Sequence, residues 1–229
     1  MIPVIAIRPQ PGCDATVAAA RASGLDAHGF PLFHIRPIAW QPPSPDQFDA
    51  LLLGSANALR HGGPALAAYA RKPAYAVGAT TAKAASMAGF DVVARGAGGI
   101  QAVLAMLRPE HRRLLRLSGR ERVAIDPPRG LSIDERVVYA SEPLPLPAEL
   151  KKMLARPAVV LLHSAEAAHH FSRLCDAEQV ARARLSLAAL GPRIVKAAGD
   201  GWHAVEVART PGDTALLALA RQMCQNRPG

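Results

Sequence analysis

Five short loops of small, polar and cationic residues stand out in this chain, because each follows an apolar run at the point where a strand should end. They are Ser55-Ala56-Asn57, Gly78-Ala79-Thr80-Thr81, Ser118-Gly119-Arg120, Ser164-Ala165 and Gly191-Pro192-Arg193. A helix that begins at such a loop offers unpaired backbone N–H groups and partial positive charge, which suit carboxylates. One such loop alone is better explained as a tight turn with a helix cap. Five of them at the edge where open α/β sheets bind ligands predict a site for an anionic molecule.

Side chains near these loops could contribute to binding and to proton transfer. Arg8, Arg120, Arg122 and Arg193 lie in or beside the loops. A guanidinium binds a carboxylate through two hydrogen bonds, although each arginine taken alone is better explained as a solvated surface residue. Tyr139 stands at the end of another expected strand, where its phenol could donate a proton to a ligand or simply pack with its hydroxyl in water.

The chain also contains an internal repeat. The segment Leu51–Ala58 recurs as Val160–Ala167 at an offset of 109 residues, and weaker matches follow each copy at offsets of 112 and 113 residues. The weaker matches pair Tyr75–Ala85 with Leu187–Ala198, and Gly89–Val93 with Gly201–Val205. Repeats of this length indicate two similar domains rather than a solenoid, whose units run about 20–50 residues. We therefore expect the site to lie between two domains.

Apolar runs alternate with alanine-rich stretches, which is typical of βαβ units and parallel sheets. The expected strands are Val4–Ile7, Asp26–Phe30, Ala50–Leu53, Ala74–Val77, Asp91–Ala94, Leu114–Leu117, Arg136–Tyr139, Ala158–Leu162, Leu185–Leu190 and Ala204–Val207. The expected helices are Asp14–Ser23, Asn57–Ala70, Thr80–Ala88, Gly99–Leu107, Ala148–Leu154, Ala165–Leu174, Pro192–Ala198 and Asp213–Gln225. The fold class predicted is α/β, with two similar doubly wound parallel-sheet lobes of the flavodoxin or Rossmann kind.

The order of the repeated parts indicates that one domain is inserted into the other. A strand-loop-helix-strand unit precedes the first Ser-Ala run at Val4–Phe33, and a similar unit at Leu114–Tyr139 precedes the second. We therefore expect a discontinuous lobe of residues 1–36 plus 142–229 and an inserted lobe of residues 37–141. Prolines near both crossings favour extended, non-helical segments, so two hinge strands are expected near residues 33–37 and 139–145.

The net charge of the chain indicates which kind of molecule it could bind. The formal charge is +9, and most of the cations are arginine, with 22 Arg and 5 Lys. Such a surface favours polyanions or a polycarboxylated small molecule, although an arginine-rich composition can equally follow from a GC-rich genome. Aromatic residues make up only 4% of the chain, which argues against a stacking platform for single-stranded nucleic acid.

Other patterns argue against a membrane, a nucleotide cofactor and a metal. No apolar stretch reaches the length of a membrane helix, and the beginning of the chain lacks a basic n-region, so a cytoplasmic protein is expected. The odd number of cysteines indicates reduced, unpaired thiols. Gln101 replaces the third glycine of a dinucleotide fingerprint at Gly96–Gly99. His169 and His170 are adjacent in an expected helix and point apart, so no metal site is predicted.

The order and spacing of these features resemble the uroporphyrinogen-III synthase family over essentially the whole chain. The resemblance rests on Arg8-Pro9, Phe30-Pro31-Leu32-Phe33, Asp49–Arg60, Tyr75–Ala82, Leu117-Ser118-Gly119, Val137-Val138-Tyr139, His163-Ser164-Ala165 and Ala189-Leu190-Gly191-Pro192. It implies two α/β lobes joined by a two-stranded ladder, with a linear tetrapyrrole carrying eight carboxylates bound between them.

The resemblance also implies a reaction. Hydroxymethylbilane would be cyclised to uroporphyrinogen III with inversion of ring D and loss of water, without a metal or nucleotide cofactor, by a monomer. Tyr139 matches a tyrosine proposed to assist the departure of hydroxide. Two loop residues differ from the family pattern: Gly54 stands where many relatives have threonine, and Ile194 stands where some have a threonine hydroxyl.

Two other hypotheses remain open on the sequence. A non-catalytic two-lobed module that binds a polycarboxylated small molecule would carry the same loops. A basic nucleic-acid-binding protein would instead need one contiguous basic face and steeply salt-dependent binding.

Overall fold

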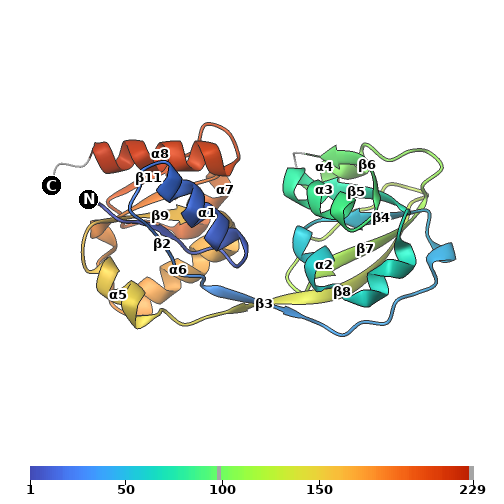
Figure 1. Ribbon diagram of the computed structural model, residues 1–229, viewed down its shortest axis with the longest axis horizontal. Helices are drawn as coiled ribbons and strands as arrows, with labels where there is room; N and C mark the ends of the chain where they lie inside the picture. Colours follow the sequence, from blue (N-terminus) through green and yellow to red (C-terminus); the bar gives the residue numbers. More distant parts are fainter. Residues whose placement is uncertain (97–98, 227–229) are drawn as a thin grey trace. The chain divides into compact units, whose positions relative to one another are not determined.

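The computed structural model describes residues 1–96 and 99–226, so Ala97 and Gly98 of the glycine-rich loop lie outside the described part. Its internal contacts divide the chain into two compact units. Unit 1 consists of Met1–His34 and Glu142–Gly229, and unit 2 consists of Ile35–Ser141. The chain therefore passes from one unit to the other twice, inside β3 (Phe33–Pro37) and inside β8 (Ser132–Pro143) (Figure 1).

Unit 1 is built on a five-stranded sheet in the order β11-β10-β9-β1-β2. Its strands are β1 (Val4–Ala6), β2 (Ala27–Gly29), β9 (Ala158–Leu162), β10 (Leu185–Ala189) and β11 (Ala204–Val207). Its helices are α1 (Gly12–Ala22), α5 (Ala148–Leu154), α6 (Ala165–Ala177), α7 (Pro192–Ala198), α8 (Asp213–Gln225) and the short 3-10 turn η3 (Arg182–Arg184). All strand pairs from β11 to β2 run parallel.

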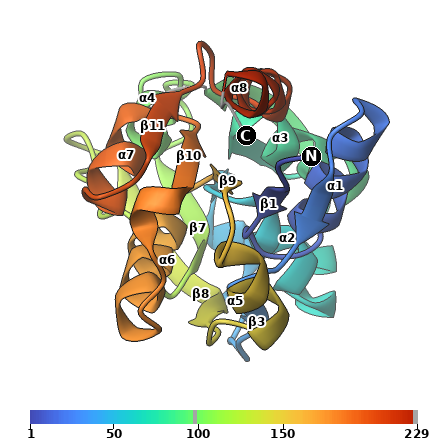
Figure 2. The same cartoon turned by 90° about the vertical axis from the view of Figure 1, so that its left-hand side faces the viewer.

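Helices cover both faces of the unit 1 sheet, because alternate residues of each strand point to opposite sides. Val160 and Leu162 of β9 pack with residues of α5, α6 and α7, whereas Val159 and Leu161 pack with residues of α1 and α8. Figure 2 shows this layering, with α8 and α1 on one side of the strands and α5 and α6 on the other. Burial on both faces explains why β9 is apolar throughout rather than alternating.

Unit 2 is built on a six-stranded sheet in the order β3-β8-β7-β4-β5-β6. Its remaining strands are β4 (Ala50–Leu53), β5 (Pro73–Val77), β6 (Asp91–Gly96) and β7 (Arg113–Gly119). Its helices are α2 (Ala56–His61), α3 (Gly78–Met87), α4 (Ile100–Leu104) and the 3-10 turns η1 (Pro45–Gln47) and η2 (Pro64–Tyr69). Strands β8, β7, β4, β5 and β6 pair in parallel. The structure thus confirms an α/β fold with helices on parallel sheets.

The two sheets place the repeated segments alike. Leu53 and Leu162 end the central strands β4 and β9, and each is followed two residues later by the Ser that begins a helix. When the strand orders of the two sheets are compared, β9, β1 and β2 of unit 1 correspond to β4, β7 and β8 of unit 2. The internal repeat of the sequence therefore reflects two sheets with the same local order.

Three expectations for unit 2 were wrong. The helix expected over Asn57–Ala70 is two elements, α2 and η2, because Gly63 has φ +72 and Pro64 cannot continue the helix before it. The helix expected between the strands at Leu114 and Tyr139 is not formed by any of residues 120–131, which include two consecutive prolines. β8 also begins at Ser132, four residues before the expected strand Arg136–Tyr139, and runs on to Pro143 in the segment where the second hinge strand was expected.

Further observations concern the crossing between the units and the ends of helices. Phe33–Pro37 lies where a hinge strand was expected and forms β3 at the edge of the unit 2 sheet beside β8. Gly24 and Gly89 follow α1 and α3 with positive φ, +80 and +86, a conformation common where helices end. Among the described residues, no helix is long and apolar enough to span a membrane.

Leu53 and Leu162 offer a matched test of the two cores, since both are fully buried. Each change to Ala should lower the free energy of unfolding of its own unit by about 2–5 kcal/mol, because it removes packing and leaves a cavity. Urea unfolding checks this, with Trp202 reporting unit 1 and Trp40 reporting unit 2 in single-tryptophan versions. Met87 is 80% exposed, so Met87→Ala should change stability by less than about 0.5 kcal/mol. Equal losses in both units from either leucine change would contradict separate cores.

Candidate active site at the carboxyl ends of the strands

The two repeated serines begin helices at equivalent places. The Ser55 hydroxyl accepts a hydrogen bond from the Asn57 backbone N–H at 3.2 Å, and the Ser164 hydroxyl accepts one from the Ala167 N–H at 3.1 Å. Each serine is the N-cap of its helix, in extended backbone conformation. These hydroxyls therefore hold the loops in shape, while the backbone N–H groups beside them face the carboxyl end of the sheet.

Glycine begins the next helix of each unit. Gly78 opens α3 with φ +75, a left-handed conformation that favours glycine, and Gly191 is the N-cap of α7. Pro192 occupies the first turn of α7, where its missing N–H removes a donor and its ring fixes the backbone. Thr80 is exposed on α3, whereas Thr81 is only 5% exposed and packs on the inner side of that helix.

The loop Ser118-Gly119-Arg120 differs from the expectation that every loop precedes a helix. Strand β7 runs through Ser118 and Gly119, and the residues that follow form no helix before β8. Anion binding here cannot come from a helix dipole and must come from side chains and strand-end N–H groups. Ser118 is engaged already, since its hydroxyl donates a hydrogen bond of 2.7 Å to the Glu135 carboxylate. Arg120 is exposed.

Tyr139 does not end its strand but lies inside β8, directly opposite Gly119 of β7. The backbone N–H of Arg120 donates to the Tyr139 carbonyl at 2.9 Å, which fixes the two strands at this point. A β carbon at position 119 would stand 2.7 Å from two carbons of the Tyr139 ring and 3.0 Å from its hydroxyl. Gly119 is thus the residue that lets the Tyr139 ring lie flat against β7.

A cavity of about 230 Å³ at this end of the unit 2 sheet brings four of the expected site residues together. Ser55 lines it from the loop after β4, and Ser118, Gly119 and Tyr139 line it from β7 and β8. Arg116 and Arg122 also line it, and Arg122 was singled out beside the loops from the sequence. Ala56 is buried at the start of α2, and Asn57 accepts a hydrogen bond from Arg60. The arrangement combines a phenol, two guanidiniums and a glycine strand end in one hollow.

The unit 1 edge carries its own cluster of charged residues. The Arg8 guanidinium contacts both carboxylate oxygens of Asp213, at 3.0 and 3.2 Å, and the Thr16 hydroxyl donates to the same carboxylate at 2.9 Å. Arg8 was expected to be available to a ligand; in the structure it is paired with Asp213. Ser164, Ala165, Gly191 and Arg193 follow β9 and β10 at this edge, and Arg193 is exposed.

His163 is the most buried titratable side chain of the unit 1 cluster. Its side chain is 6% exposed, and its Nε2 lies 3.3 Å from Asp213 Oδ1, within ion-pair range but without a well-formed hydrogen bond. Burial lowers the pKa of His163, and this effect exceeds the opposing attraction of Asp213. The contact with His163 and the charge of Arg8 hold the pKa of the Asp213 carboxyl at about 2.

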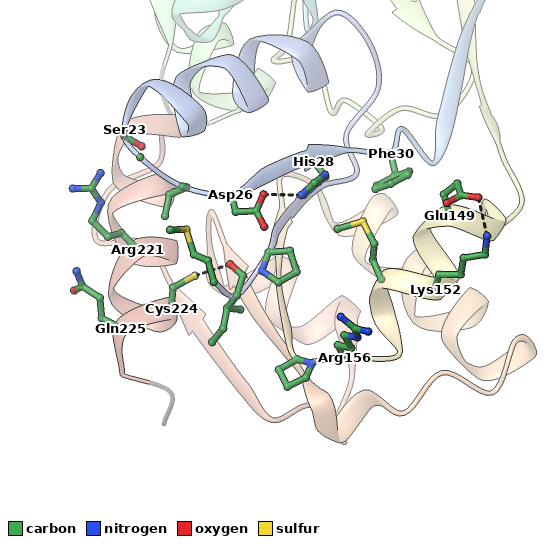
Figure 3. Close-up of a pocket in the computed structure, with 17 residues that line it drawn as sticks. Ser23, Asp26, His28, Phe30, Glu149, Lys152, Arg156, Arg221, Cys224 and Gln225 are labelled. Carbon is green, nitrogen blue, oxygen red and sulfur yellow. Dashed lines mark hydrogen bonds and ion pairs between the residues drawn. The ribbon is translucent and has the colours of Figure 1, made fainter. Parts of the chain in front are cut away.

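A larger cavity of about 1270 Å³ lies in unit 1 but at the opposite end of its sheet (Figure 3). It is lined by residues that precede β1, β2 and β9, such as Pro3, Asp26 and Pro157. Its acidic side chains are paired locally, Asp26 with His28 and Glu149 with Lys152. Because open α/β sheets bind at the carboxyl ends of their strands, we take the smaller cavity beside Tyr139 as the candidate site.

Comparison with known proteins then assigns the family. The family profile described as "Uroporphyrinogen-III synthase HemD" matches residues 14–218, most of the chain. The chain belongs to the uroporphyrinogen-III synthase family. Members of this family are cyclising lyases of tetrapyrrole biosynthesis. Among curated protein sequences, none matches the chain significantly.

Solved structures of uroporphyrinogen-III synthases share the fold. The synthetase from Helicobacter pylori is 17% identical, with a TM-score of 0.66 over 97% of this chain and 100% of that one. A mutant synthase from Thermus thermophilus is 18% identical, with a TM-score of 0.56 over 99% of this chain and 100% of that one. At these identities the likeness establishes the fold of this chain and carries no information on the contacts of its side chains.

The synthase has one candidate residue that sequence reasoning missed. Arg116 sits between leucines in the middle of an apolar strand, and the chain alone gave no reason to separate it from other arginines. The alternation of β7 could have indicated it, because a charged residue at a buried position of a parallel strand needs a partner. Among the described residues, no group of three or more His, Cys, Asp or Glu side chains could hold a metal ion.

The buried His163 of this synthase should make its stability fall as the pH drops below about 6.5. The unfolded chain takes up a proton on His163 near that pH, whereas the folded chain, with its lowered pKa, does not, so acid favours unfolding. His163→Gln removes this contribution, and its melting temperature should fall less than that of the wild type between pH 7 and pH 5. Asp213 does not contribute in this window, since its carboxyl titrates between its ordinary pKa of 3.8 and about 2. Parallel melting curves for the two proteins would contradict a buried, neutral His163.

Proposed function

We propose that this chain cyclises hydroxymethylbilane to uroporphyrinogen III, with inversion of ring D and loss of water. Family membership supports the reaction class. The observation that carries the proposal is the position of Tyr139, whose phenol stands in a cavity together with two guanidiniums and the end of β7. A proton donor beside cations suits a substrate that carries many carboxylates and must lose a hydroxide.

The proposed chemistry begins at the terminal hydroxymethyl group. The C–O bond breaks as the Tyr139 phenol delivers a proton, so that water leaves and the ring becomes an azafulvene cation. Ring D attacks this cation through its substituted carbon and gives a spiro intermediate. Fragmentation and re-closure leave ring D inverted, and the proton lost in the final rearomatisation returns to the phenolate. The sum is hydroxymethylbilane converted to uroporphyrinogen III and water.

Most of the catalytic task in this proposal is positioning. Without an enzyme the linear tetrapyrrole closes to the uninverted isomer, so the protein must hold a folded geometry in which the direct attack cannot occur. The substrate-binding groups we propose are those at the carboxyl ends of both sheets. They are Arg8, Ser55, Ala56, Asn57, Gly78, Thr80, Thr81, Ser118, Gly119, Arg120, Ser164, Ala165, Gly191, Pro192 and Arg193.

These residues differ in how they would act. Backbone N–H groups at the starts of α3 and α6 offer donors to carboxylates, and the exposed Arg120 and Arg193 offer guanidiniums. Pro192 has no N–H and would shape its loop, while the buried Thr81 would act through packing of α3. Arg8 would have to exchange its Asp213 partner for a substrate carboxylate.

We further propose that the enzyme acts as a cytoplasmic monomer without a cofactor, on a small molecule rather than on nucleic acid. The three cysteines support a reducing compartment, because all of them are free and Cys13 and Cys175 are buried. Both copies of the repeated loop belong to one chain, which supports activity without a partner subunit.

The first test is turnover. Purified protein given fresh hydroxymethylbilane without added cofactor should form mainly isomer III, faster than the spontaneous reaction, as resolved by chromatography of the oxidised porphyrins. Specific activity should not change on dilution, as expected for a monomer. Isomer I alone at the spontaneous rate would overturn the proposal and leave a two-lobed binding module for a polycarboxylated molecule.

The second test concerns the phenol. Tyr139→Phe should lower kcat by about tenfold or more, because it removes the proton donor while leaving the ring in place. Gly119→Ala should lower kcat similarly, because its β carbon would stand 2.7 Å from the Tyr139 ring and force the ring to move. Tyr69→Phe is the matched control: it deletes a phenol that bonds the Pro43 carbonyl in the unit 2 core, and kcat should be unchanged. Wild-type turnover by Tyr139→Phe would remove Tyr139 from the mechanism.

A further inference from the structure

Arg116 is a charged residue in a place that the fold otherwise reserves for apolar side chains. It lies in β7 between Leu52 of β4 and Glu135 of β8, and it is 5% exposed. Its neighbours Leu115 and Leu117 are fully buried. Arginine is rarely buried to this degree unless it is fully paired, so its partners decide what it does.

The guanidinium of Arg116 is incompletely paired. Its Nη2 donates to the Val123 carbonyl at 2.8 Å, and its Nη1 lies 3.5 Å from Glu135 Oε1, which is too long for a strong charged hydrogen bond. Its Nε is fully buried and has no hydrogen-bond partner. Burial lowers the pKa of Arg116, which expresses the same deficit of compensation around the charged form.

One carboxylate oxygen serves both nearby arginines. Glu135 Oε1 lies 2.5 Å from Arg122 Nε and accepts a hydrogen bond from the Ser118 hydroxyl at 2.7 Å, besides its longer contact with Arg116. Two guanidiniums therefore share a single negative charge, and the group keeps an excess of one positive charge. In a partly buried setting such an excess favours a further anion.

Open space adjoins this group on two sides. Arg116 and Arg122 both line a cavity of about 440 Å³ that also includes Glu135. Both also line the cavity of about 230 Å³ that contains Tyr139. Both cavities thus adjoin the two guanidiniums, and the smaller one is also lined by the carboxylate residue Glu121.

The internal repeat argues that Arg116 is not needed to build the sheet. Arg116 pairs with Leu52, whose repeat counterpart Leu161 pairs with Ala6. The same place in the unit 1 sheet is thus filled by alanine, which is 1% exposed. Since this sheet accepts a small apolar residue there, an incompletely paired arginine calls for a reason beyond folding.

We propose that Arg116, together with Arg122, binds one carboxylate side chain of the substrate in the cavity that Tyr139 also lines. Glu135 holds the two guanidiniums together until that carboxylate binds and then shares them with it. Arg116 thereby contacts the substrate directly and holds one of its carboxylates equally in the ground state and the transition state. This inference rests on the proposed function, because it takes the ligand to be the polycarboxylated tetrapyrrole.

The decisive experiment measures three quantities for each variant: KM, kcat and the dissociation constant (Kd) of the product. The product Kd is measured with uroporphyrinogen III by equilibrium dialysis under nitrogen, which prevents its oxidation. Arg116→Gln should raise KM and the product Kd by about tenfold, while kcat changes by less than about threefold, because it removes a ground-state contact. Glu135→Gln should instead lower the product Kd by about threefold, because the competing charge is gone while a hydrogen-bonding group remains. Arg108→Gln is the charge-matched control: this exposed residue precedes β7 at the other end of the sheet, and its constants should equal those of the wild type.

The outcomes separate this inference from the proposed function. A wild-type protein that forms no isomer III fails the proposed function, whereas an active wild type with unchanged KM and Kd in Arg116→Gln overturns the inference. Loss of kcat and thermal stability in Arg116→Gln, with product affinity retained, would assign Arg116 to bracing the Val123 loop and would also overturn it. If Arg116→Gln does not fold, Glu135→Gln decides: tighter product binding supports the carboxylate site, and unchanged or weaker binding overturns it.

Discussion

Parallel pairing of strands is the constraint on which both the fold and the candidate site depend. A parallel strand can be reached only by a crossover, and each crossover in these units leaves the sheet at the carboxyl end of a strand. The crossing helices bury both faces, which is why β4 and β9 are apolar at every position. The topology therefore places the loops at Ser55 and Ser164 at the carboxyl end of their own sheets. Residues in these loops are not needed in the core and can take part in binding.

Acidic residues at the carboxyl ends of the sheets stabilise the arginines of the candidate site in the absence of a ligand. Asp213 holds Arg8 and His163 in unit 1, and Glu135 holds Arg116 and Arg122 in unit 2. In a chain of net charge +9, unpaired arginines at the same edge would repel one another and cost stability. Asp213 removes that cost for Arg8, whereas Glu135 is shared by two guanidiniums and leaves them incompletely neutralised.

Much of the fold could be predicted because its strongest signals are local. The strand Ala158–Leu162 and the helix Asp213–Gln225 were expected with the bounds that the structure has, since an apolar run and an amphipathic period identify them without tertiary information. The first residues of β8, from Ser132 to Glu135, escaped prediction because they are exposed or partly exposed and are ordered by pairing with β7.

The candidate site was predictable to the extent that its residues lie in loops. Ser55, Gly119 and Tyr139 were expected at strand ends, and the structure places them around one cavity. The partner of Tyr139 could not be anticipated, because only the register of β7 with β8 sets Gly119 against its ring. Arg116 was hidden for the same reason: its significance depends on which residue of the neighbouring strand it faces.

The way the chain enters and leaves unit 2 has a consequence for how such a protein can change. Residues 35 and 141 bound the unit and belong to β3 and β8, which are neighbours in the sheet, so the two ends of the inserted segment emerge side by side. Insertions or deletions between them leave the spacing of every strand in unit 1 untouched. Because both ends of the inserted unit lie next to each other, the unit can vary in length, or be replaced by a similar domain, without a change in the fold of unit 1.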